Sequence, residues 1–433
     1  MRTTKSYKLT HPGKFKDQLF EWSRQFDEIA WLDSNDYDRE KSNFDALLAV
    51  TAFTAIKTDS FQAFKRLQEY QQTTKDWIFG YLSYDLKNDV EQLKSKNFDG
   101  LQFPDLYFFQ PQKIIILKAN IAEFHYLRMV DDEIDMDMEK ILSAAKEEEP
   151  ETSSIRKIEL KSRLSHSEYI EKVKTMLTHI QRGDIYEANF CQEFFAENAR
   201  ISPHKVFTKL NALSRPPFAT FIKLEQQYLM CASPERYMKK SGNKITSQPI
   251  KGTARRSGDK KEDLEIAQKL EHDPKEISEN VMIVDLVRND LSKIAKKGSV
   301  LVKELCKVYS FEQVHQMIST VSAQLEEGIP AVEVLRSTFP MGSMTGAPKI
   351  SAMKIIEELE ETKRGLYSGA VGYFTPGDDF DFNVVIRSIL YNAENQYVSF
   401  SVGGAITSKS SPEKEYEECL LKAKAMREAL SAS

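Results

Sequence analysis

The stretch SHSEYIEKVKTMLTHIQRGDIYEANFCQEFF, residues 165–195, predicts one helix that leads directly into one strand. Ser165 and Glu168 have the spacing of a capping box, which begins a helix, and Gly183 is a residue type that commonly ends one. Between these positions, apolar side chains recur at helical spacing: Ile170, Val173, Leu177 and Ile180. Residues 189–195 then have the composition of a strand.

Outward from this stretch, helices and strands are mixed. Strand-like runs follow at residues 218–222, 228–232 and 244–249, and residues 384–391 and 397–402 predict a pair of strands. Helices are predicted over residues 275–294 and 412–430, the second with Ser411 at its N-cap and Pro412 at its first position. Because the order is not a regular alternation of strand and helix, the sequence predicts an α+β fold with a large, mostly antiparallel sheet system flanked by helices.

The composition is that of an ordinary globular protein. The 433 residues are 41% hydrophobic and 29% charged, and the formal net charge of -5 gives no basic field for nucleic acid. The acidic run from Asp131 to Glu151 suggests a boundary, which divides the chain into residues 1–150 and 151–433.

The cysteine pattern and the apolar runs bear on location. The four cysteines are far apart, without a CxxC pair, so buried thiols in a reducing compartment are expected. Residues 1–13 lack the apolar core of a signal peptide, and the apolar run 46–56 is too short to span a membrane. We therefore expect a cytoplasmic protein without a membrane partner.

Two pairs of glutamates lie on predicted helices. Glu276 and Glu279 are three residues apart, and Glu415 and Glu418 repeat that spacing, with Lys422 one turn further on. Each pair alone is typical of a solvated helix face. If the two pairs faced one another they would repel unless a cation lay between them, and Mg2+ suits such an oxygen ligand set.

Two glycine-containing loops are candidates for ligand binding. Residues 342–349, GSMTGAPK, fail the pattern of a nucleotide-binding P-loop, because Pro348 removes a backbone donor and Ile350 replaces the Ser or Thr. A turn leading into a helix is expected there. Gly403 and Gly404 follow a strand and would permit close approach of a ligand, or form a simple bulge.

Three titratable residues are candidates for catalysis. Lys251 lies at a strand end in PIKGT, where a desolvated lysine can lose its proton and act as a nucleophile. Glu235, in SPER, could be a general acid if burial raised its pKa, although Arg236 beside it equally suggests an ion pair. His315 is expected to be a hydrogen-bonded core histidine.

Nine ordered segments resemble one known family. Over residues 165–430 the chain is similar to the chorismate-utilising enzymes, which include aminodeoxychorismate, anthranilate, isochorismate and salicylate synthases. The resemblance rests on GDIYEANF (183), SPER (233), PIKGT (249), ENVMIVDLVRNDL (279), VHQMIST (314), FPMGSMTGAPK (339), RGLYSGAVGYF (364), DFNVVIRS (381) and SPEKEYEE (411). It implies the family's fold, and a partnering or regulatory role for residues 1–150, which resemble the N-terminal region of anthranilate synthase component I.

The lysine of PIKGT resembles the branch of aminodeoxychorismate synthase component I, also called para-aminobenzoate synthase component I, because other branches usually have alanine there. That resemblance implies amination of chorismate at ring carbon 4. Glu235 would protonate the leaving 4-hydroxyl while neutral Lys251 attacks ring carbon 2. Ammonia would then attack carbon 4 and expel the lysine, on the way to p-aminobenzoate and folate.

The resemblance also implies ligands for the metal and the substrate. Glu279 and Glu418 would bind Mg2+ directly, with Glu276 and Glu415 nearby or acting through water. The substrate-facing positions are Tyr367, Arg387, Gly403, Gly404 and Lys422 for its anionic groups, Thr253 beside the ring, and His315 near the leaving group.

The chain departs from the family at Glu187, where relatives commonly have Gln and the isochorismate and salicylate branch has a base, Lys. This argues against isochorismate chemistry and leaves open whether Glu187 steers or deprotonates the incoming ammonium. Ala405 makes the glycine loop GGA, with little expected effect. Residues 31–34 and 214–218 match the tryptophan-binding stretches of some relatives poorly, so feedback inhibition by tryptophan is not expected.

The source of ammonia is not visible in the chain, since no cysteine lies in the glycine-rich turn of a glutaminase. A separate glutamine amidotransferase subunit is therefore expected as partner. The main alternative is anthranilate synthase component I, which aminates carbon 2 and eliminates pyruvate. A non-catalytic paralogue that binds chorismate is a third possibility, disfavoured by the presence of Glu235, Lys251 and the four paired glutamates.

Overall fold

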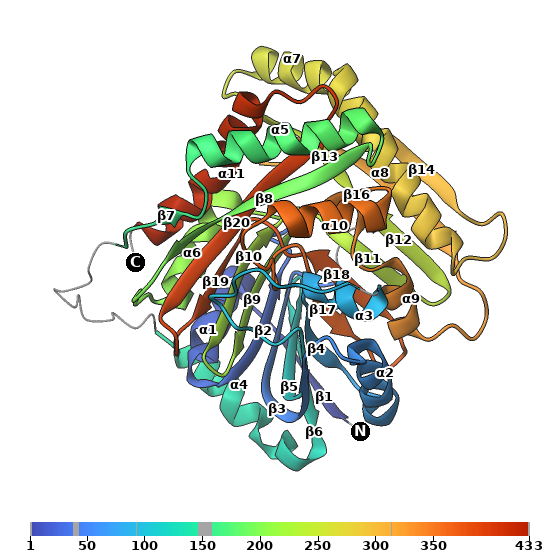
Figure 1. Ribbon diagram of the computed structural model, residues 1–433. Coiled ribbons are helices and arrows are strands. Elements are labelled where there is room, and N and C mark those ends of the chain that lie inside the picture. Colours follow the sequence, from blue (N-terminus) through green and yellow to red (C-terminus); the bar gives the residue numbers. More distant parts are fainter. Residues whose placement is uncertain (1, 38–42, 92, 146–157, 313, 432–433) are drawn as a thin grey trace.

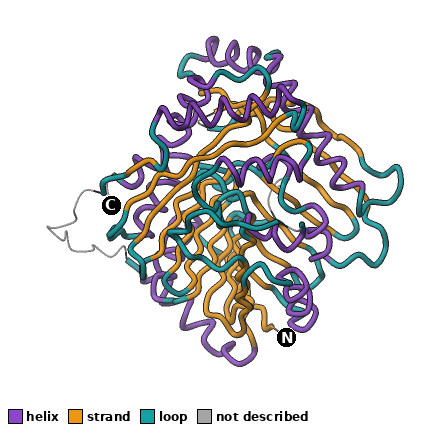
Figure 2. Tube along the Cα trace, in the orientation of Figure 1, coloured by secondary structure: helices purple, strands orange, loops and turns teal. Residues whose placement is uncertain are grey.

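The computed structural model describes residues 2–37, 43–91, 93–145, 158–312 and 314–431 (Figure 1). Its strands form one continuous sheet of 20 strands in which every strand pair is antiparallel, and helices lie around it (Figure 2). The α+β prediction with a large antiparallel sheet is confirmed.

The strands are β1 (Arg2–Lys8), β2 (Glu28–Asp33), β3 (Ala46–Thr58), β4 (Ile78–Leu82), β5 (Leu106–Lys118), β6 (Ile121–Leu127), β7 (Lys161–Ser162), β8 (Glu187–Ala196), β9 (Phe218–Leu224), β10 (Gln227–Ser233), β11 (Arg236–Ser241), β12 (Lys244–Gln248), β13 (Ile250–Arg255), β14 (Leu301–Ser310), β15 (Val314–Gln324), β16 (Gly346–Ala347), β17 (Ala370–Phe374), β18 (Phe380–Val384), β19 (Ser388–Asn392) and β20 (Tyr397–Thr407). The helices are α1 (Pro12–Trp22), α2 (Ala63–Thr74), α3 (Lys87–Val90), α4 (Ile134–Ser143), α5 (His166–Arg182), α6 (Pro203–Ser214), α7 (Lys260–Glu271), α8 (Pro274–Ser292), α9 (Ala331–Thr338), α10 (Lys349–Leu359) and α11 (Pro412–Leu430).

The strand β5 joins two arms of the sheet. On one edge it pairs with β3, and the first arm continues through β2, β9, β10, β19 and β20 to β8. On its other edge it pairs with β6 and with β4, and the second arm continues from β4 through β17, β18, β11 and β12 to β15, β13 and β14. Each arm thus contains strands from both halves of the sequence.

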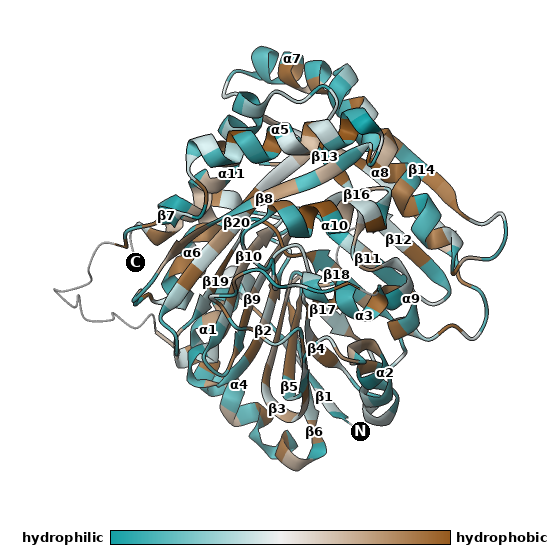
Figure 3. Cartoon of the chain, in the orientation of Figure 1, coloured by the Kyte–Doolittle hydropathy of each residue, from teal (hydrophilic) through white to brown (hydrophobic). Residues whose placement is uncertain are grey.

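Both faces of β5 are covered, which explains its continuous apolar run. Ile114 and Ile116 enter one buried hydrophobic cluster, whereas Ile115 and Leu117 enter the other. Since neighbouring side chains of a strand point to opposite faces, a strand buried on both sides reads as unbroken hydrophobic sequence. The outer helices, such as α5 and α7, alternate hydrophilic and hydrophobic residues (Figure 3).

Two short connections carry the chain from one arm to the other. Residues 234–235 link β10 to β11, and residues 385–387 link β18 to β19. The connections lie side by side, because the N–H of Val384 donates to the carbonyl of Glu235 at 3.0 Å and the N–H of Ala232 donates to the carbonyl of Arg387 at 3.2 Å. The crossing of the arms therefore brings Glu235 and Arg387 together.

The local predictions mostly hold, with one correction. The capping box of Ser165 and Glu168 and the left-handed C-cap at Gly183 are present, and α11 spans Pro412–Leu430 as expected. Ser411 occupies the N-cap position of α11, but its side chain makes no cap hydrogen bond. The single strand predicted over residues 384–391 is wrong: β18 ends and β19 begins there, because Arg387 adopts a left-handed conformation with φ of 53°.

The predicted boundary at residue 150 lies within residues 146–157, outside the described residues. Within the described ranges, no helix combines the length and apolar character needed to cross a membrane.

Candidate active site

Glu235 is a buried carboxyl at the crossing of the two arms. Its side-chain oxygen Oε1 accepts a hydrogen bond of 2.7 Å from the hydroxyl of Ser343, and the residue is 5% exposed. Burial raises the pKa of Glu235 to about 7, against the opposing effects of Ser343 and the positive charge of Lys251. A carboxyl group with this pKa can hold and release a proton near neutral pH, as a general acid must.

Lys251 extends from β13 toward three carboxylates. Its Nζ lies 3.5 Å from Oε1 of Glu187, and its side chain is 13% exposed. Burial alone would lower the pKa of Lys251, but the negative charges of Glu187, Glu279 and Glu235 outweigh it and hold the pKa above its ordinary value. In the substrate-free protein these carboxylates therefore favour the ammonium form of Lys251, whereas an attack on the ring requires the neutral form.

The two glutamate pairs lie on helices that face one another. Helix α8, which carries Glu279, packs on β13 and β15, and α11, which carries Glu415, packs on β20. The ammonium of Lys275 joins them, at 3.8 Å from Glu279 and 3.5 Å from Glu415. A cation between the pairs is what their mutual repulsion requires, and here a lysine provides it.

The negative charge and the carboxylate oxygens of this centre suit a divalent cation. Oε1 of Glu279 is buried without a hydrogen-bond partner, and burial raises the pKa of this carboxyl to about 7. Burial and the charge of Glu418 raise the pKa of Glu276, although Lys275 opposes them. A cation would relieve these costs, and an all-carboxylate set suits Mg2+. In the described residues, however, no three such side chains are gathered closely enough to hold an ion.

Two glycines line this centre. A Cβ on Gly252 would lie 3.1 Å from a carboxylate oxygen of Glu276. A Cβ on Gly404 would lie 3.4 Å from Glu415, 3.5 Å from Glu418 and 3.8 Å from the Nζ of Lys422. The backbone therefore approaches the carboxylates closely from both sheet arms.

A group of cationic and hydroxyl side chains lies beside the carboxylates. Lys422 donates to the carbonyl of Gly403 at 2.8 Å and pairs with Glu418 at 2.7 Å. Tyr367 is buried, with its hydroxyl 3.5 Å from the thiol of Cys191. The guanidinium of Arg387 has no hydrogen-bond or ion-pair partner among the described residues, so it is available for an anion. Burial lowers the pKa of Arg387, which Tyr367 and Glu418 oppose.

Two predicted substrate contacts, His315 and Thr253, are not among the carboxylates and cations described above. His315 is buried, and its ring nitrogens contact Ser310 at 2.9 Å and Asp263 at 3.0 Å. It is thus the hydrogen-bonded core histidine that its sequence setting suggests, and a substrate contact would require it to exchange a partner. Thr253 lies on β13 two residues after Lys251, with an exposed side chain.

Behind the site, a buried arginine ties two catalytic segments together. Arg364 pairs with Glu360 at 2.7 Å and donates to the carbonyls of Met344 at 2.6 Å and Asn189 at 2.7 Å. Met344 follows Ser343 in sequence, and Asn189 is two residues beyond Glu187. Arg364 therefore fixes the turn that holds Glu235 relative to the strand that faces Lys251.

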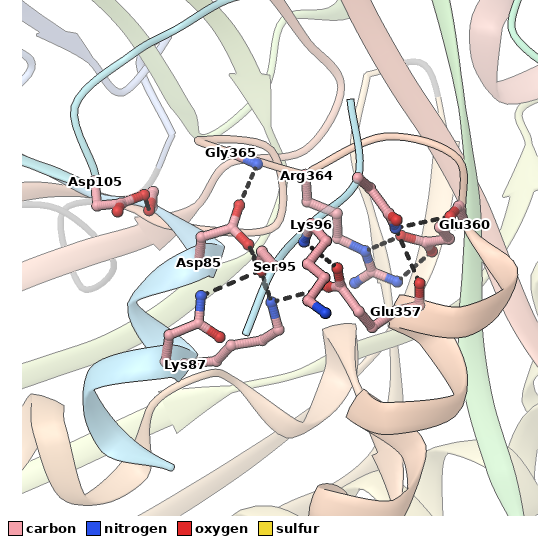
Figure 4. Close-up of polar contacts among 12 residues, drawn as sticks. Asp85, Lys87, Ser95, Lys96, Asp105, Glu357, Glu360, Arg364 and Gly365 are labelled. Atoms are coloured by element: carbon pink, nitrogen blue, oxygen red, sulfur yellow. Dashed lines mark hydrogen bonds and ion pairs between the residues drawn. The ribbon is translucent and has the colours of Figure 1, made fainter. Parts of the chain in front are cut away.

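Figure 4 shows that this network extends to the N-terminal half of the chain. Asp85 accepts from the N–H of Gly365 at 2.9 Å and from the ammonium of Lys87 at 3.0 Å. Lys87 also lies 3.4 Å from Glu357 on α10. Buried charges thus connect residues 85–87 to the segment that carries Arg364.

Sequence reasoning missed Ser343, Lys275 and Arg364. Ser343 lies in the GSMTGAPK segment, for which the sequence predicts a turn into a helix, and the structure has that turn before α10. Lys275 directly precedes Glu276, and its position next to an acidic pair was the available signal. Arg364 begins one of the family-like segments but gave no sign of burial.

The two stretches compared with tryptophan-binding segments do meet in space. Residues of both, including Asp33, Ser34, Pro217 and Phe218, line one cavity. Asp33 pairs with Lys16 at 2.6 Å, which places an internal ion pair beside that cavity. No effector is implied by this contact.

Comparison with known proteins agrees with this arrangement. A family model described as chorismate binding enzyme matches residues 27–428. Aminodeoxychorismate synthase component 1 of Bacillus subtilis is 31% identical over 367 residues, which cover 82% of this chain and 77% of that protein. The Escherichia coli protein of the same name is 40% identical over 257 residues, which cover 59% of this chain and 56% of its own.

Proteins with another name are also similar. The crystal structure of anthranilate synthase component I from Streptococcus pneumoniae superposes with a TM-score of 0.77 at 25% identity, covering 88% of this chain and 91% of that one. Relatives named anthranilate synthase component 1 are matched by sequence as well. Overall similarity is therefore shared by proteins with two different names, and individual residues must separate them.

Proposed function

The chain belongs to the family of chorismate-binding enzymes, and from that premise we propose that it aminates chorismate at ring carbon 4 to give 4-amino-4-deoxychorismate. The observation that carries the proposal is the partly buried Lys251, which lies 3.5 Å from Glu187 and interacts electrostatically with Glu235. A lysine and a carboxyl acid in one buried centre are what a covalent substitution needs. This is the activity of an aminodeoxychorismate synthase component 1, a transferase of p-aminobenzoate and folate synthesis.

The first half of the reaction uses Lys251 and Glu235. Because the surrounding carboxylates favour the ammonium form of Lys251, the lysine first loses one proton to solvent. Its nitrogen then bonds to ring carbon 2, the ring double bond shifts, and the bond from carbon 4 to oxygen breaks. The oxygen leaves as water with the proton of Glu235. One difficult substitution is thereby divided into two easier ones.

The second half reverses the attachment. An ammonium ion gives one proton to Glu235, which regenerates the acid, and the resulting ammonia bonds to carbon 4. The double bond returns, the bond between carbon 2 and Lys251 breaks, and the lysine recovers its proton from solvent. Chorismate and ammonium are consumed, and the aminated product and water are released.

Chorismate carries two carboxylates, so the acidic centre needs positive charge to accept it. We assign Glu279 and Glu418 as direct ligands of Mg2+, with Glu276 and Glu415 beside them. When bound, the ion neutralises these carboxylates and attracts the anionic substrate. Arg387, Tyr367, Lys422 and the backbone at Gly403–Gly404 would hold the remaining substrate oxygens.

We infer that ammonia comes from a separate glutaminase subunit. The name component 1 in the similar proteins supports a second component, and the four cysteines lack the sequence setting of a glutaminase nucleophile. Glutamine-dependent turnover that appears only when a glutaminase subunit is added, with co-elution of the two chains in gel filtration, tests this. Glutamine use by the isolated chain would contradict it.

The experiment for the reaction itself is a product assay. The purified chain is incubated with chorismate, Mg2+ and ammonium, with and without aminodeoxychorismate lyase, and the products are separated by chromatography. Formation of p-aminobenzoate only with lyase supports carbon-4 amination. Anthranilate without lyase would mean that the chain is an anthranilate synthase component I. Intact chorismate in all reactions would indicate a non-catalytic paralogue.

A further inference from the structure

Glu187 has one carboxylate oxygen in use and one without a partner. Its Oε1 lies 3.5 Å from Lys251, whereas its Oε2 is buried and accepts no hydrogen bond from any described residue. The residue is only 1% exposed. A carboxylate accepts hydrogen bonds but donates none, and buried polar atoms in native proteins nearly always have a partner. Oε2 can therefore accept a hydrogen bond from a small molecule or ion that binds next to it.

The position of this carboxylate is fixed by the sheet. Glu187 opens β8 and is paired on one side with Thr407 of β20 and on the other with Ala347 of β16. A Cβ on Gly346 would lie 2.2 Å from the backbone oxygen of Glu187, so only glycine permits this approach of β16. A strand held from both sides places Oε2 in one location, which favours a built site over a mobile side chain.

The negative charge around Glu187 favours a cationic donor. The negative charge of Glu187 acts on the pKa of Glu279, so the two carboxylates lie in one electrostatic environment. Two ammonium groups of this centre are already engaged, Lys251 with Glu187 itself and Lys275 with Glu279 and Glu415. A small cation that carries N–H donors satisfies both the hydrogen-bonding deficit and the negative potential.

We propose that Oε2 of Glu187 is the binding position for the ammonium ion that supplies the new amino group. This rests on the proposed function, in which ammonium is a substrate and reacts next to Lys251. In that function Glu235 protonates the leaving oxygen, and the four paired glutamates bind or flank the divalent cation. Glu187 is then the carboxylate that can bind the nitrogen source.

The kinetic experiment compares the wild-type enzyme with Glu187→Gln, which keeps the shape and removes the charge. With ammonium chloride as the variable substrate, we expect KM for ammonium to rise about tenfold to a hundredfold, the value of a charged hydrogen bond. The dissociation constant of chorismate, measured separately by fluorescence titration, should change less than about twofold. An unchanged KM for ammonium overturns the proposal.

A matched control lies on the same strand. Glu193 is also a buried carboxylate of β8, but both of its oxygens are engaged, by Arg163 at 2.8 Å and Tyr397 at 3.0 Å. Glu193→Gln should leave KM for ammonium unchanged. If Glu193→Gln raises it as much as Glu187→Gln does, the effect is a general loss of order in β8 and the proposal fails.

A structural experiment is independent of turnover. Crystals of the wild-type protein are soaked in rubidium chloride, because Rb+ has nearly the size of ammonium and scatters anomalously. We expect a peak at Glu187 that is absent from Glu187→Gln, and no peak in the wild type would overturn the site. If Rb+ binds while the product is anthranilate or chorismate stays intact, the cation site stands and the proposed reaction fails, so the two failures are distinguishable.

Discussion

The hydroxyl of Ser343 donates a hydrogen bond to the carboxyl of Glu235 across 108 residues of sequence. The bond stabilises the carboxylate and so opposes the increase in pKa that burial causes. Ser343 thereby limits how strongly the proposed acid holds its proton.

Removal of the Ser343 hydroxyl should shift the pH dependence of the reaction. In Ser343→Ala the pKa of Glu235 rises above its value of about 7, because one stabilising contact of the charged form is lost. The protonated acid then persists to higher pH, and the alkaline limb of the kcat profile should move upward by about one pH unit. Ser233→Ala is the control, since the Ser233 hydroxyl bonds the backbone of Glu235, accepting from its N–H and donating to its carbonyl. A limb that stays in place would contradict this role.

The same carboxyl should reduce stability at alkaline pH. Its folded pKa of about 7 exceeds the ordinary value of 4.5, so folding holds the proton more tightly than the unfolded chain does. Stability is therefore lost as pH rises from about 4.5 to about 7. Glu235→Gln should melt a few degrees higher than wild type at pH 8 and show no gain at pH 4.5. Equal differences at both pH values would indicate a packing effect.

Lys251→Ala should nearly abolish carbon-4 amination. The variant lacks the nitrogen that bonds to the ring, and loss of a covalent nucleophile commonly costs at least about a thousandfold in kcat. Steady-state turnover with ammonium, followed by chromatography of the product, gives the value. A rate close to wild type would remove the nucleophilic role, and a change of product to anthranilate would show that Lys251 selects the site of amination.

Lys275 should matter most when no divalent cation is present. Lys275→Gln leaves Glu279 and Glu415 without their shared ammonium, so we expect a melting temperature a few degrees below wild type in EDTA. Excess Mg2+ should narrow the difference, because the ion replaces the lost charge. Lys293→Gln, which removes an ion pair of 3.1 Å with Asp290 at the end of the same helix, should show no such dependence on Mg2+.

Breaking the buried pair of Arg364 and Glu360 should be costly. Arg364→Met leaves Glu360 charged and buried, which we expect to lower the free energy of unfolding by about 3–5 kcal/mol. The double variant with Glu360→Gln should recover part of the loss, because no uncompensated charge remains. Urea unfolding of the four proteins forms a double-mutant cycle. Additive losses would show that the two side chains act independently.

Features that depend on neighbouring residues could be predicted from the sequence. Ser165, Glu168 and Gly183 bound α5 as expected, and Pro412 begins α11 as predicted. The pairing of 384–391 with 397–402 was correct only in part, since nothing in VVIRS announces the left-handed turn at Arg387. Such a turn is imposed by the crossing of two sheet arms, which is a property of distant contacts.

The residues of the site could be predicted from the sequence, but their pKa values and hydrogen-bond partners could not. Family-like segments pointed to Glu235, Lys251 and the glutamate pairs, and the structure gathers them. The raised pKa of Lys251 depends on Glu187, Glu279 and Glu235, which are distant in sequence, so no local pattern could predict it. The satisfied hydrogen bonds of His315 likewise depend on Asp263, 52 residues away.

Finally, the interleaved sheet limits how this chain can be shortened or recombined. β2 lies between β3 and β9, and β4 lies between β5 and β17, so the first 150 residues supply inner strands to both arms. A fragment that begins at residue 151 would expose the apolar edges of β9 and β17, which invite aggregation. Grafting the N-terminal half from a relative would succeed only if the donor strands matched these two registers, so the two halves are expected to evolve together.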